Sequence, residues 1–165
     1  MTTDVEISKA GGIQTLRFTR SAKKNAITLA MYKAFADALA AGDADDDVLV
    51  HVILGSGGVF SSGNDIGEFL TNAKGGELGA DGARFIRQLP QVKKPLVAGI
   101  DGPAIGIGTT LIMHCDLVYA TPASVFATPF LDLGLVPEAA SSLTMTERMG
   151  VAWAFEMLVL GEAFN

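Results

Sequence analysis

The sequence is poor in cysteine and in basic residues. Cys115 is the only cysteine among 165 residues, so the chain can form no internal disulfide and has no cysteine-based metal site. Lys and Arg number 12 against 18 Asp and Glu, which gives a formal net charge of −6. A nucleic-acid surface needs clustered Lys and Arg, so we expect no nucleic-acid partner. We also predict no metal site, because the aspartate-rich segment 43–47 has no further ligands near it in the sequence.

Long hydrophobic runs are absent as well. No apolar stretch approaches the roughly 18 residues that a membrane-spanning helix needs. The polar start, Met1–Glu6, does not look like a signal peptide. We therefore expect no membrane partner and a cytoplasmic location.

Hydrophobic residues and glycines, by contrast, are plentiful. Hydrophobic residues make up 49% of the chain, which is enough for a sizeable core, and the length predicts one domain over residues 1–165. The 19 glycines gather in short clusters without a repeat. Such clusters indicate tight turns and close approaches between backbones.

The order of expected elements predicts an α/β fold with a mainly parallel sheet. A hairpin over residues 5–18 is followed by a helix that Thr28 can cap and Gly42 can end. Residues 48–54 form a nearly unbroken apolar run, which is typical of a strand buried on both faces. The remaining elements expected are strands over 96–100 and 117–119 and helices over 109–114, 138–149 and 151–160.

Three short segments are candidates for a functional site: residues 60–66, 102–108 and 133–138. Each also has an ordinary structural interpretation. The first can be a glycine loop in which Asp65 caps a helix, and the second can be close packing of a helix on a sheet. In the third, Glu138 can be an acid at a helix N-terminus, where it complements the helix dipole.

The second segment also has part of a dinucleotide-binding pattern. Gly106 and Gly108 match two of its three glycines, but Leu111 stands where the third belongs. No acidic residue follows at the distance expected for a ribose contact. We therefore predict no dinucleotide cofactor.

Taken together, the three segments resemble the crotonase (enoyl-CoA hydratase/isomerase) superfamily, and the resemblance runs from about Val5 to the last residue. It implies a ββα spiral with a mainly parallel sheet. It also implies that the backbone N–H groups of Asn64 and Ile107 hold the oxygen of an acyl thioester. Ser62 and Asp65 are expected to support the loop. The residues that the resemblance places at the substrate are Ser62, Gly63, Asn64, Asp65, Ile66 and Ile107.

The coenzyme A part of the substrate is expected near residues 21–26. The family binds adenosine diphosphate at the matching loop, which here contains Lys24 and Ala26. Lys23 and Lys24 can meet phosphates, although lysines in a surface loop are often only solvated. Because coenzyme A belongs to the substrate, the resemblance implies no separate cofactor.

The acidic residues favour isomerisation over hydration. Hydratases of the family resemble one another in two glutamates that activate water, and the matching positions here are Thr110 and Phe130. Glu138 instead matches the catalytic glutamate of peroxisomal-type Δ3,Δ2-enoyl-CoA isomerases. Its apolar neighbours favour a raised carboxyl pKa. The resemblance thus implies an isomerase of fatty-acid oxidation with Glu138 as the base.

Other functions remain open at this point. A related enzyme can use Glu138 as a thioesterase or decarboxylase, and a non-catalytic protein can bind acyl-CoA without chemistry. A serine hydrolase is disfavoured because no G-x-S-x-G motif is present. The two histidines, His51 and His114, lie in apolar segments that predict core positions.

Crotonases are longer than this chain. In the family, the further part is helical, covers the acyl pocket and helps to form trimers. We therefore expect the chain to lack the C-terminal helical part and the protein to form a homotrimer or a dimer of trimers. A peroxisomal location is an alternative if the source is eukaryotic.

Overall fold

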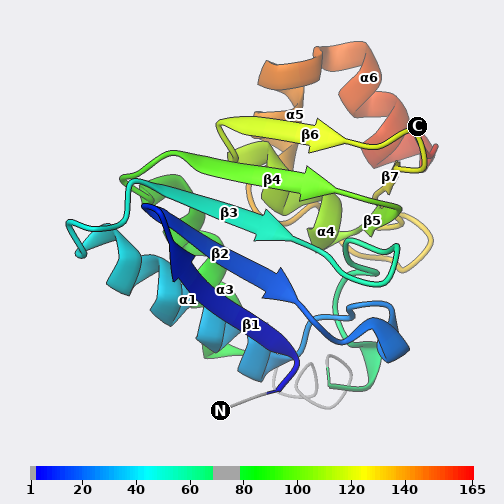
Figure 1. The fold of residues 1–165 in the computed structure, drawn as a ribbon. Coiled ribbons are helices and arrows are strands. Elements are labelled where there is room, and N and C mark those ends of the chain that lie inside the picture. The colour runs from blue at the N-terminus through cyan, green and yellow to red at the C-terminus, as the bar shows by residue number, and fades with distance from the viewer. Residues whose placement is uncertain (1–2, 69–78) are drawn as a thin grey trace.

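The computed structural model describes residues 3–68 and 79–165. Its main sheet has five strands in the order β1-β2-β3-β4-β6, drawn side by side in Figure 1. β1 and β2 pair antiparallel, whereas β2, β3, β4 and β6 are parallel neighbours, which confirms the mainly parallel α/β sheet. The strands span Val5–Ala10, Ile13–Phe18, Val50–Leu54, Leu96–Ile100 and Leu117–Ala120.

The predicted N-terminal hairpin is present. β1 and β2 are joined at Gly11 and Gly12, which both have positive φ, of 57° and 81°. A two-residue hairpin turn favours positive φ at its central positions, and glycine adopts it without steric cost. Ala10 therefore pairs with Ile13 directly across the turn.

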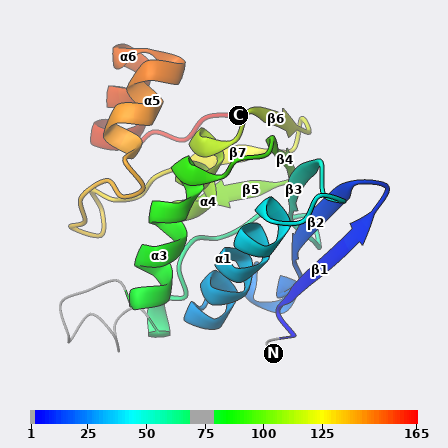
Figure 2. The same cartoon turned by 90° about the vertical axis from the view of Figure 1, so that its left-hand side faces the viewer.

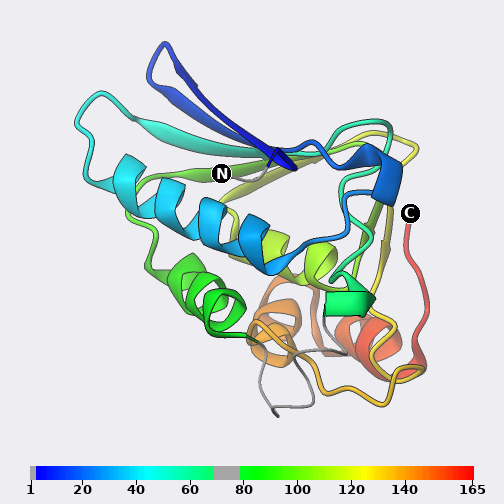
Figure 3. The same cartoon turned by 90° about the horizontal axis from the view of Figure 1, so that it is seen from below.

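Two helices, α1 (Leu29–Asp43) and α3 (Ala80–Gln88), lie on the same side of the main sheet (Figure 3). The Thr28 side chain accepts a hydrogen bond from the Met31 amide at 3.3 Å, so the predicted cap is present. The prediction that Gly42 ends the helix is wrong, because α1 continues to Asp43. A Cβ at Gly42 would lie 2.2 Å from Gln14 Oε1, so this glycine serves close packing on the sheet.

Aromatic rings fill the space between these helices and the sheet. Phe18 of β2 stacks on Phe35 of α1 with ring centroids 4.7 Å apart. Phe60 meets Phe18 edge to face at 5.6 Å, and Phe85 of α3 lies 5.4 Å from Tyr32. These contacts join sheet, helices and the first glycine loop in one core, so the loop that begins at Phe60 has a rigid support.

The expectation of a strand buried on both faces over 48–54 is wrong in two respects. β3 begins at Val50, and the Leu49 side chain is 68% exposed. Within β3, His51 and Ile53 are fully buried, whereas the alternate residues are only half-buried. In the described part of the chain the helices lie on one side of the sheet (Figure 3), so only one face is fully covered.

A second, smaller sheet carries the glycine loops. It consists of β5 (Pro103–Ile105) and β7 (Val125–Ala127), which pair in parallel and were not predicted from the sequence. Each strand has three residues, too few for a recognisable hydrophobic period. Isolated bridges extend this sheet at both edges: Ile27 with Asn64, Ser61 with Ala104, and Phe126 with Phe164.

Short helices make up the rest of the fold. The helix expected over 109–114 begins earlier, as α4 (Ile107–Thr110) followed by the 3₁₀ turn η3 (Leu111–His114). The helix expected over 138–149 begins later, as α5 (Ser141–Met149). Figure 2 shows α5 and α6 beside each other and away from α1. No helix within residues 3–68 and 79–165 has the length and apolar character to cross a membrane. The short elements are η1 (Ser21–Lys23), η2 (Leu89–Gln91), α4 (Ile107–Thr110), η3 (Leu111–His114), α5 (Ser141–Met149), α6 (Val151–Phe155) and the π-helical turn η4 (Glu156–Leu160).

Candidate active site

The two glycine loops meet backbone to backbone. Ile105 N donates to Ser61 O at 2.8 Å, which places the segment before Gly106 against the segment before Gly63. A Cβ at Gly63 would lie 3.1 Å from Ile105 O, and one at Gly106 would lie 3.9 Å from Gly63 Cα. Both glycines also have positive φ, of 91° and 57°. The backbone conformation therefore favours glycine at both positions, and the close approach to Ile105 adds to that preference at Gly63.

Two amide N–H groups at this junction have no acceptor in the part of the chain that the structure describes. The neighbouring amides are paired: Gly63 N with Ser61 Oγ, and Gly106 N with Ala127 O. For Asn64 and Ile107, no acceptor exists among the residues that the structure describes. Ile107 opens α4, and the first amides of a helix have no partner within it. Two unpaired donors at one junction are suited to bind an oxygen that carries negative charge.

A cavity of about 350 Å³ lies at the same junction, a volume within the usual range for small-molecule sites. Its wall is mainly apolar and includes five of the predicted substrate-binding residues. Asp65, Lys24 and Ala26 are not part of the described wall. The lining residues are Ser62, Gly63, Asn64, Ile66, Ile105, Gly106, Ile107, Pro129, Phe130, Asp132, Leu133 and Leu135.

Glu138 is held beside these loops by a partly buried hydrogen bond. The Thr110 hydroxyl donates to Glu138 Oε1 at 2.5 Å. The other carboxyl oxygen, Oε2, is buried and has no partner in the described part of the chain. Burial raises the Glu138 pKa from its ordinary value of 4.5 to about 7, although the bond from Thr110 acts in the opposite direction.

The alternative that Glu138 is an acid at a helix N-terminus is wrong. α5 begins at Ser141, and its N-cap residue is Ala140. Glu138 precedes the helix, and its side chain bonds to Thr110 of α4 instead of to the amides of the first turn of α5. Its carboxyl group is not part of the described wall of the cavity, in agreement with its desolvation.

Tyr32 connects helix α1 to this group of residues. Its hydroxyl donates to Asn64 Oδ1 at 2.5 Å, and the side chain is almost fully buried. The Tyr32 pKa is raised well above 10, first by burial and then by the negative charge of Glu138. Tyr32 therefore lies within electrostatic range of the ionised Glu138 carboxylate.

The sequence pointed to Thr110 only as the residue at a hydratase glutamate position, and it did not point to Tyr32. A buried phenol needs a hydrogen-bond partner, so the position of Tyr32 on the apolar face of its helix could have predicted a polar contact there.

Residues 21–26 are fixed beside the first glycine loop. Ser62 N donates to Lys24 O at 2.9 Å. Arg20 Nη1 donates both to Ala26 O at 3.1 Å and to Asp65 Oδ2 at 2.8 Å. The hydrogen bond from Arg20 lowers the Asp65 pKa, so this carboxylate stays ionised and holds both loops together. The Lys24 side chain is exposed, and a phosphate can therefore reach it.

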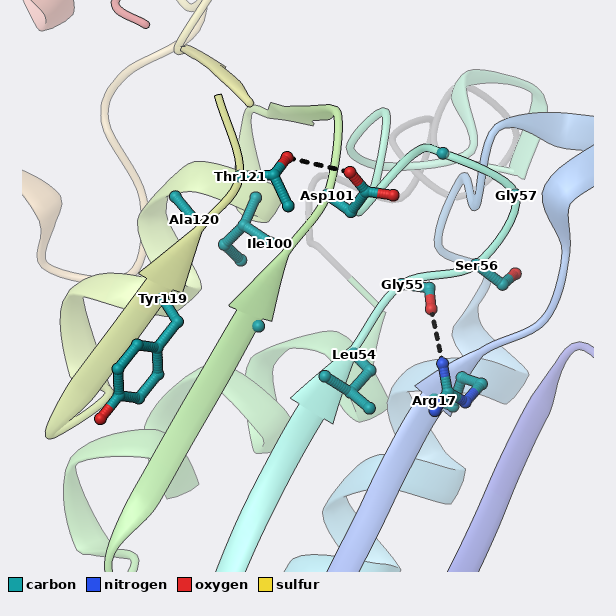
Figure 4. A pocket seen from close by; sticks show the side chains of 12 residues that line it. Arg17, Leu54, Gly55, Ser56, Gly57, Ile100, Asp101, Tyr119, Ala120 and Thr121 are labelled. Atoms are coloured by element: carbon teal, nitrogen blue, oxygen red, sulfur yellow. Dashed lines mark hydrogen bonds between the residues drawn. The ribbon is translucent and has the colours of Figure 1, made fainter. Parts of the chain in front are cut away.

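A second cavity, of about 480 Å³, lies at the carboxyl ends of β2, β3, β4 and β6 (Figure 4). Carboxyl ends of strands often bind ligands in α/β sheets. Here the prominent polar groups already have partners: Arg17 Nη1 donates to Gly55 O at 3.1 Å, and Asp101 accepts from Thr121 at 2.9 Å. The first cavity offers unpaired amides and a nearby acid, so it is the better candidate for chemistry.

His51 is buried in the core, whereas His114, for which a core position was also predicted, is only half-buried. His51 Nε2 lies 3.2 Å from Asp43 Oδ1, and His114 Nε2 lies 2.8 Å from Ala139 O. Across residues 3–68 and 79–165, no three His, Cys, Asp or Glu side chains form a group that could hold a metal ion. Neither histidine is among the residues that line the first cavity.

Residues 8–165 match the sequence family described as enoyl-CoA hydratase/isomerase. The chain belongs to this family. Enoyl-CoA delta isomerase 2 of Rattus norvegicus is 44% identical to it over 162 residues, and the alignment covers 94% of this chain and 41% of the rat protein. Enoyl-CoA delta isomerase 3, peroxisomal, of Mus musculus is 36% identical over 166 residues, which cover 96% of this chain and 51% of the mouse protein.

Solved structures of enoyl-CoA hydratase/isomerase family members have the same fold. A protein of Magnetospirillum magneticum AMB-1, provisionally named enoyl-CoA hydratase/carnithine racemase, is 51% identical and superposes with a TM-score of 0.94. The superposition covers 100% of this chain and 65% of that structure. The crotonase-like fold is thereby confirmed, and the chain spans about two fifths to two thirds of the length of the relatives described here.

Proposed function

We propose that the protein is a Δ3,Δ2-enoyl-CoA isomerase, which moves the double bond of a 3-enoyl-CoA into conjugation with its thioester. One arrangement carries the proposal. A buried glutamate with a pKa near 7 lies beside two glycine loops that present unpaired amide N–H groups at one cavity. The similarity to two named enoyl-CoA delta isomerases supports the choice of reaction.

The reaction needs one base and one anion-binding site. Glu138 Oε2 takes a proton from C2, and the electrons of that C–H bond form an enolate with the thioester carbonyl. The amides of Asn64 and Ile107 donate to the enolate oxygen, and one such donor contributes about 3 kcal/mol to transition-state stabilisation in comparable sites. Glu138 then returns the proton to C4, where the C3=C4 electrons form the new C–H bond. The enolate C1=C2 electrons move to C2=C3 and the thioester carbonyl is restored, so atoms and charge balance.

The raised pKa of Glu138 suits both halves of this reaction. A carboxyl group with a pKa near 7 is partly ionised at neutral pH and is a stronger base than an ordinary glutamate. Once protonated, it is also a competent acid for return of the proton. No water is consumed, which agrees with a wall that is mainly apolar.

Hydration lacks the groups that it needs. The two positions that carry water-activating glutamates in hydratases are Thr110 and Phe130, and both side chains are buried. Neither can remove a proton from water at neutral pH. A water molecule near the cavity would therefore remain a weak nucleophile.

Acyl-CoA thioesters are the proposed substrates, with coenzyme A along residues 21–26. We further propose a homotrimer or a dimer of trimers, because large apolar side chains of α6 are exposed in this chain, among them Trp153 and Phe155. A cytoplasmic location remains our proposal, with the peroxisome as the alternative that the name of the mouse relative suggests.

Incubation with a 3-enoyl-CoA tests the proposal, with the ultraviolet absorbance of the conjugated product as the measurement. We expect turnover by the wild type and a loss of about 10²–10⁴-fold in Glu138→Gln, which keeps size and polarity but cannot accept the proton. Glu147→Gln is the matched control, because Glu147 lies exposed on α5.

Other products would overturn the assignment. Release of free coenzyme A would indicate a thioesterase, and release of CO₂ from a suitable acyl-CoA would indicate a decarboxylase. Acyl-CoA binding without exchange of the C2 hydrogen in deuterated water would indicate a non-catalytic binding protein.

A further inference from the structure

Helix α4 brings two functional groups to the candidate site from one short stretch of backbone. Ile107 opens the helix with an unpaired amide, and Thr110 lies three residues later on the same face. Thr110 N donates to Gly106 O at 3.0 Å, and its side chain is fully buried. The position of the Thr110 hydroxyl is therefore fixed by the same turn that presents the Ile107 amide.

We propose that Thr110 is a positioning residue that fixes the Glu138 carboxyl group and leaves Oε2 as the proton-accepting oxygen. The proposal rests on the isomerase function above and adds a residue to it. Its basis is the asymmetry of the carboxyl group, because Oε1 accepts a hydrogen bond from Thr110 while Oε2 is buried and has no partner within residues 3–68 and 79–165.

The hydrogen bond can persist throughout the proton transfer. Thr110 has one hydroxyl proton, which it donates to Oε1 when Glu138 is ionised. After Oε2 takes the substrate proton, Oε1 still has lone pairs and can keep accepting from the same hydroxyl. The carboxyl group then need not rotate between taking a proton at C2 and returning it at C4.

Thr110 also keeps a second acid away from Glu138. A glutamate at position 110 would place another carboxyl group within hydrogen-bond distance of Glu138, and two such groups do not both ionise near neutral pH. Among the described residues, the polar groups that act on the Glu138 carboxyl are the Thr110 hydroxyl from α4 and, within range of its charge, the neutral Tyr32 from α1. A threonine at 110 therefore supplies a donor without adding charge.

The test measures kcat/KM for a 3-enoyl-CoA as a function of pH in the wild type and in two Thr110 variants. Thr110→Val keeps the shape but removes the donor, so the ionised form of Glu138 loses stabilisation. We expect the acidic limb of the profile to move upward by about one pH unit, with kcat lowered more than KM is raised. Thr110→Ser restores the hydroxyl and should return the acidic limb to the wild-type position.

Thr109→Val is the matched control. Thr109 is an equally buried neighbour in α4, but its hydroxyl donates to Ala104 O and not to Glu138. This variant should leave the acidic limb where the wild type has it, whatever its effect on stability. A limb that is unchanged in Thr110→Val, or shifted equally in Thr110→Val and Thr110→Ser, would overturn the positioning role.

Titration of Glu138 separates this inference from the proposed function. The carboxyl stretching band of Glu138, assigned by its loss in Glu138→Gln, can be followed by infrared difference spectroscopy in the absence of substrate. Thr110→Val should raise the midpoint, and Thr110→Ser should not. If the wild type isomerises no 3-enoyl-CoA, the proposed function fails, while the titration still decides whether Thr110 controls Glu138.

Discussion

The hydroxyl of Tyr32 donates to the side-chain oxygen of Asn64 at 2.5 Å, in a contact that joins helix α1 to the first glycine loop. Asn64 therefore has two separable parts. Its side chain accepts from a buried phenol, whereas its backbone N–H is one of the two unpaired donors at the cavity. Substitutions can remove either part.

Asn64→Ala should lower stability and keep most activity. It leaves the Tyr32 hydroxyl buried without a partner, at a cost of about 1–3 kcal/mol in the free energy of unfolding, but it keeps the amide. Asn64→Pro removes the N–H and should lower the rate by about 10²–10³-fold. Urea unfolding and 3-enoyl-CoA turnover measure the two effects. If Asn64→Ala were as inactive as Asn64→Pro, the side chain would be the working group.

Tyr32→Phe provides the other half of the same test. It removes the donor and leaves Asn64 Oδ1 without its partner, so we expect a loss of about 1 kcal/mol in the free energy of unfolding. The Tyr32→Phe, Asn64→Ala double variant should lose less than the sum of the single variants, because both remove one contact. Additive losses would show that the hydrogen bond contributes nothing measurable.

The stability of the protein should depend on pH through Glu138. Its pKa is about 7 in the folded state against an ordinary 4.5, so the folded state holds more protons between these values. The contribution is present below about pH 4.5 and is lost as pH rises to about 7, with a total of about 3 kcal/mol. Urea unfolding at about pH 5 and about pH 8 should show this decline in the wild type.

Glu138→Gln serves as the control for that measurement. Glutamine does not titrate, so the part of the decline that comes from position 138 should vanish in this variant. An identical pH dependence in both proteins would mean that the Glu138 carboxyl is solvated and titrates as an ordinary glutamate.

Hydration should be slow relative to isomerisation. The family resemblance places Thr110 and Phe130 at the positions of the water-activating glutamates, so a 2-enoyl-CoA lacks the two bases that hydratases use on water. The two rates can be compared in one preparation, with a 2-enoyl-CoA and a 3-enoyl-CoA of the same chain length. Comparable rates would contradict the isomerase assignment.

The sequence predicted those parts of the fold that have a long hydrophobic period or a characteristic turn. The hairpin at Gly11–Gly12 and the helix capped by Thr28 are examples, and the mainly parallel sheet follows from the order of such elements. The strands β5 and β7 were missed, because pairing with distant segments, not local preference, determines strands of three residues.

The candidate site was predicted mainly from the order of its motifs, and its supporting contacts were not. Asn64, Ile107 and Glu138 were chosen by resemblance, and the structure brings the loops of the first two to one cavity. The hydrogen bonds from Thr110 to Glu138 and from Tyr32 to Asn64 depend on which helix face packs against which loop. That tertiary arrangement cannot be read from local sequence patterns.

The smaller sheet has a consequence for how the protein folds. Its bridges join Ile27 to Asn64, Ser61 to Ala104, and Phe126 to Phe164, so segments from almost the whole chain pair around the cavity. Contacts between residues that are distant in sequence close large loops at a cost in chain entropy. The cavity should thus form only when these segments have paired, and the amides of Phe126 and Phe164 should gain protection from hydrogen exchange at that stage.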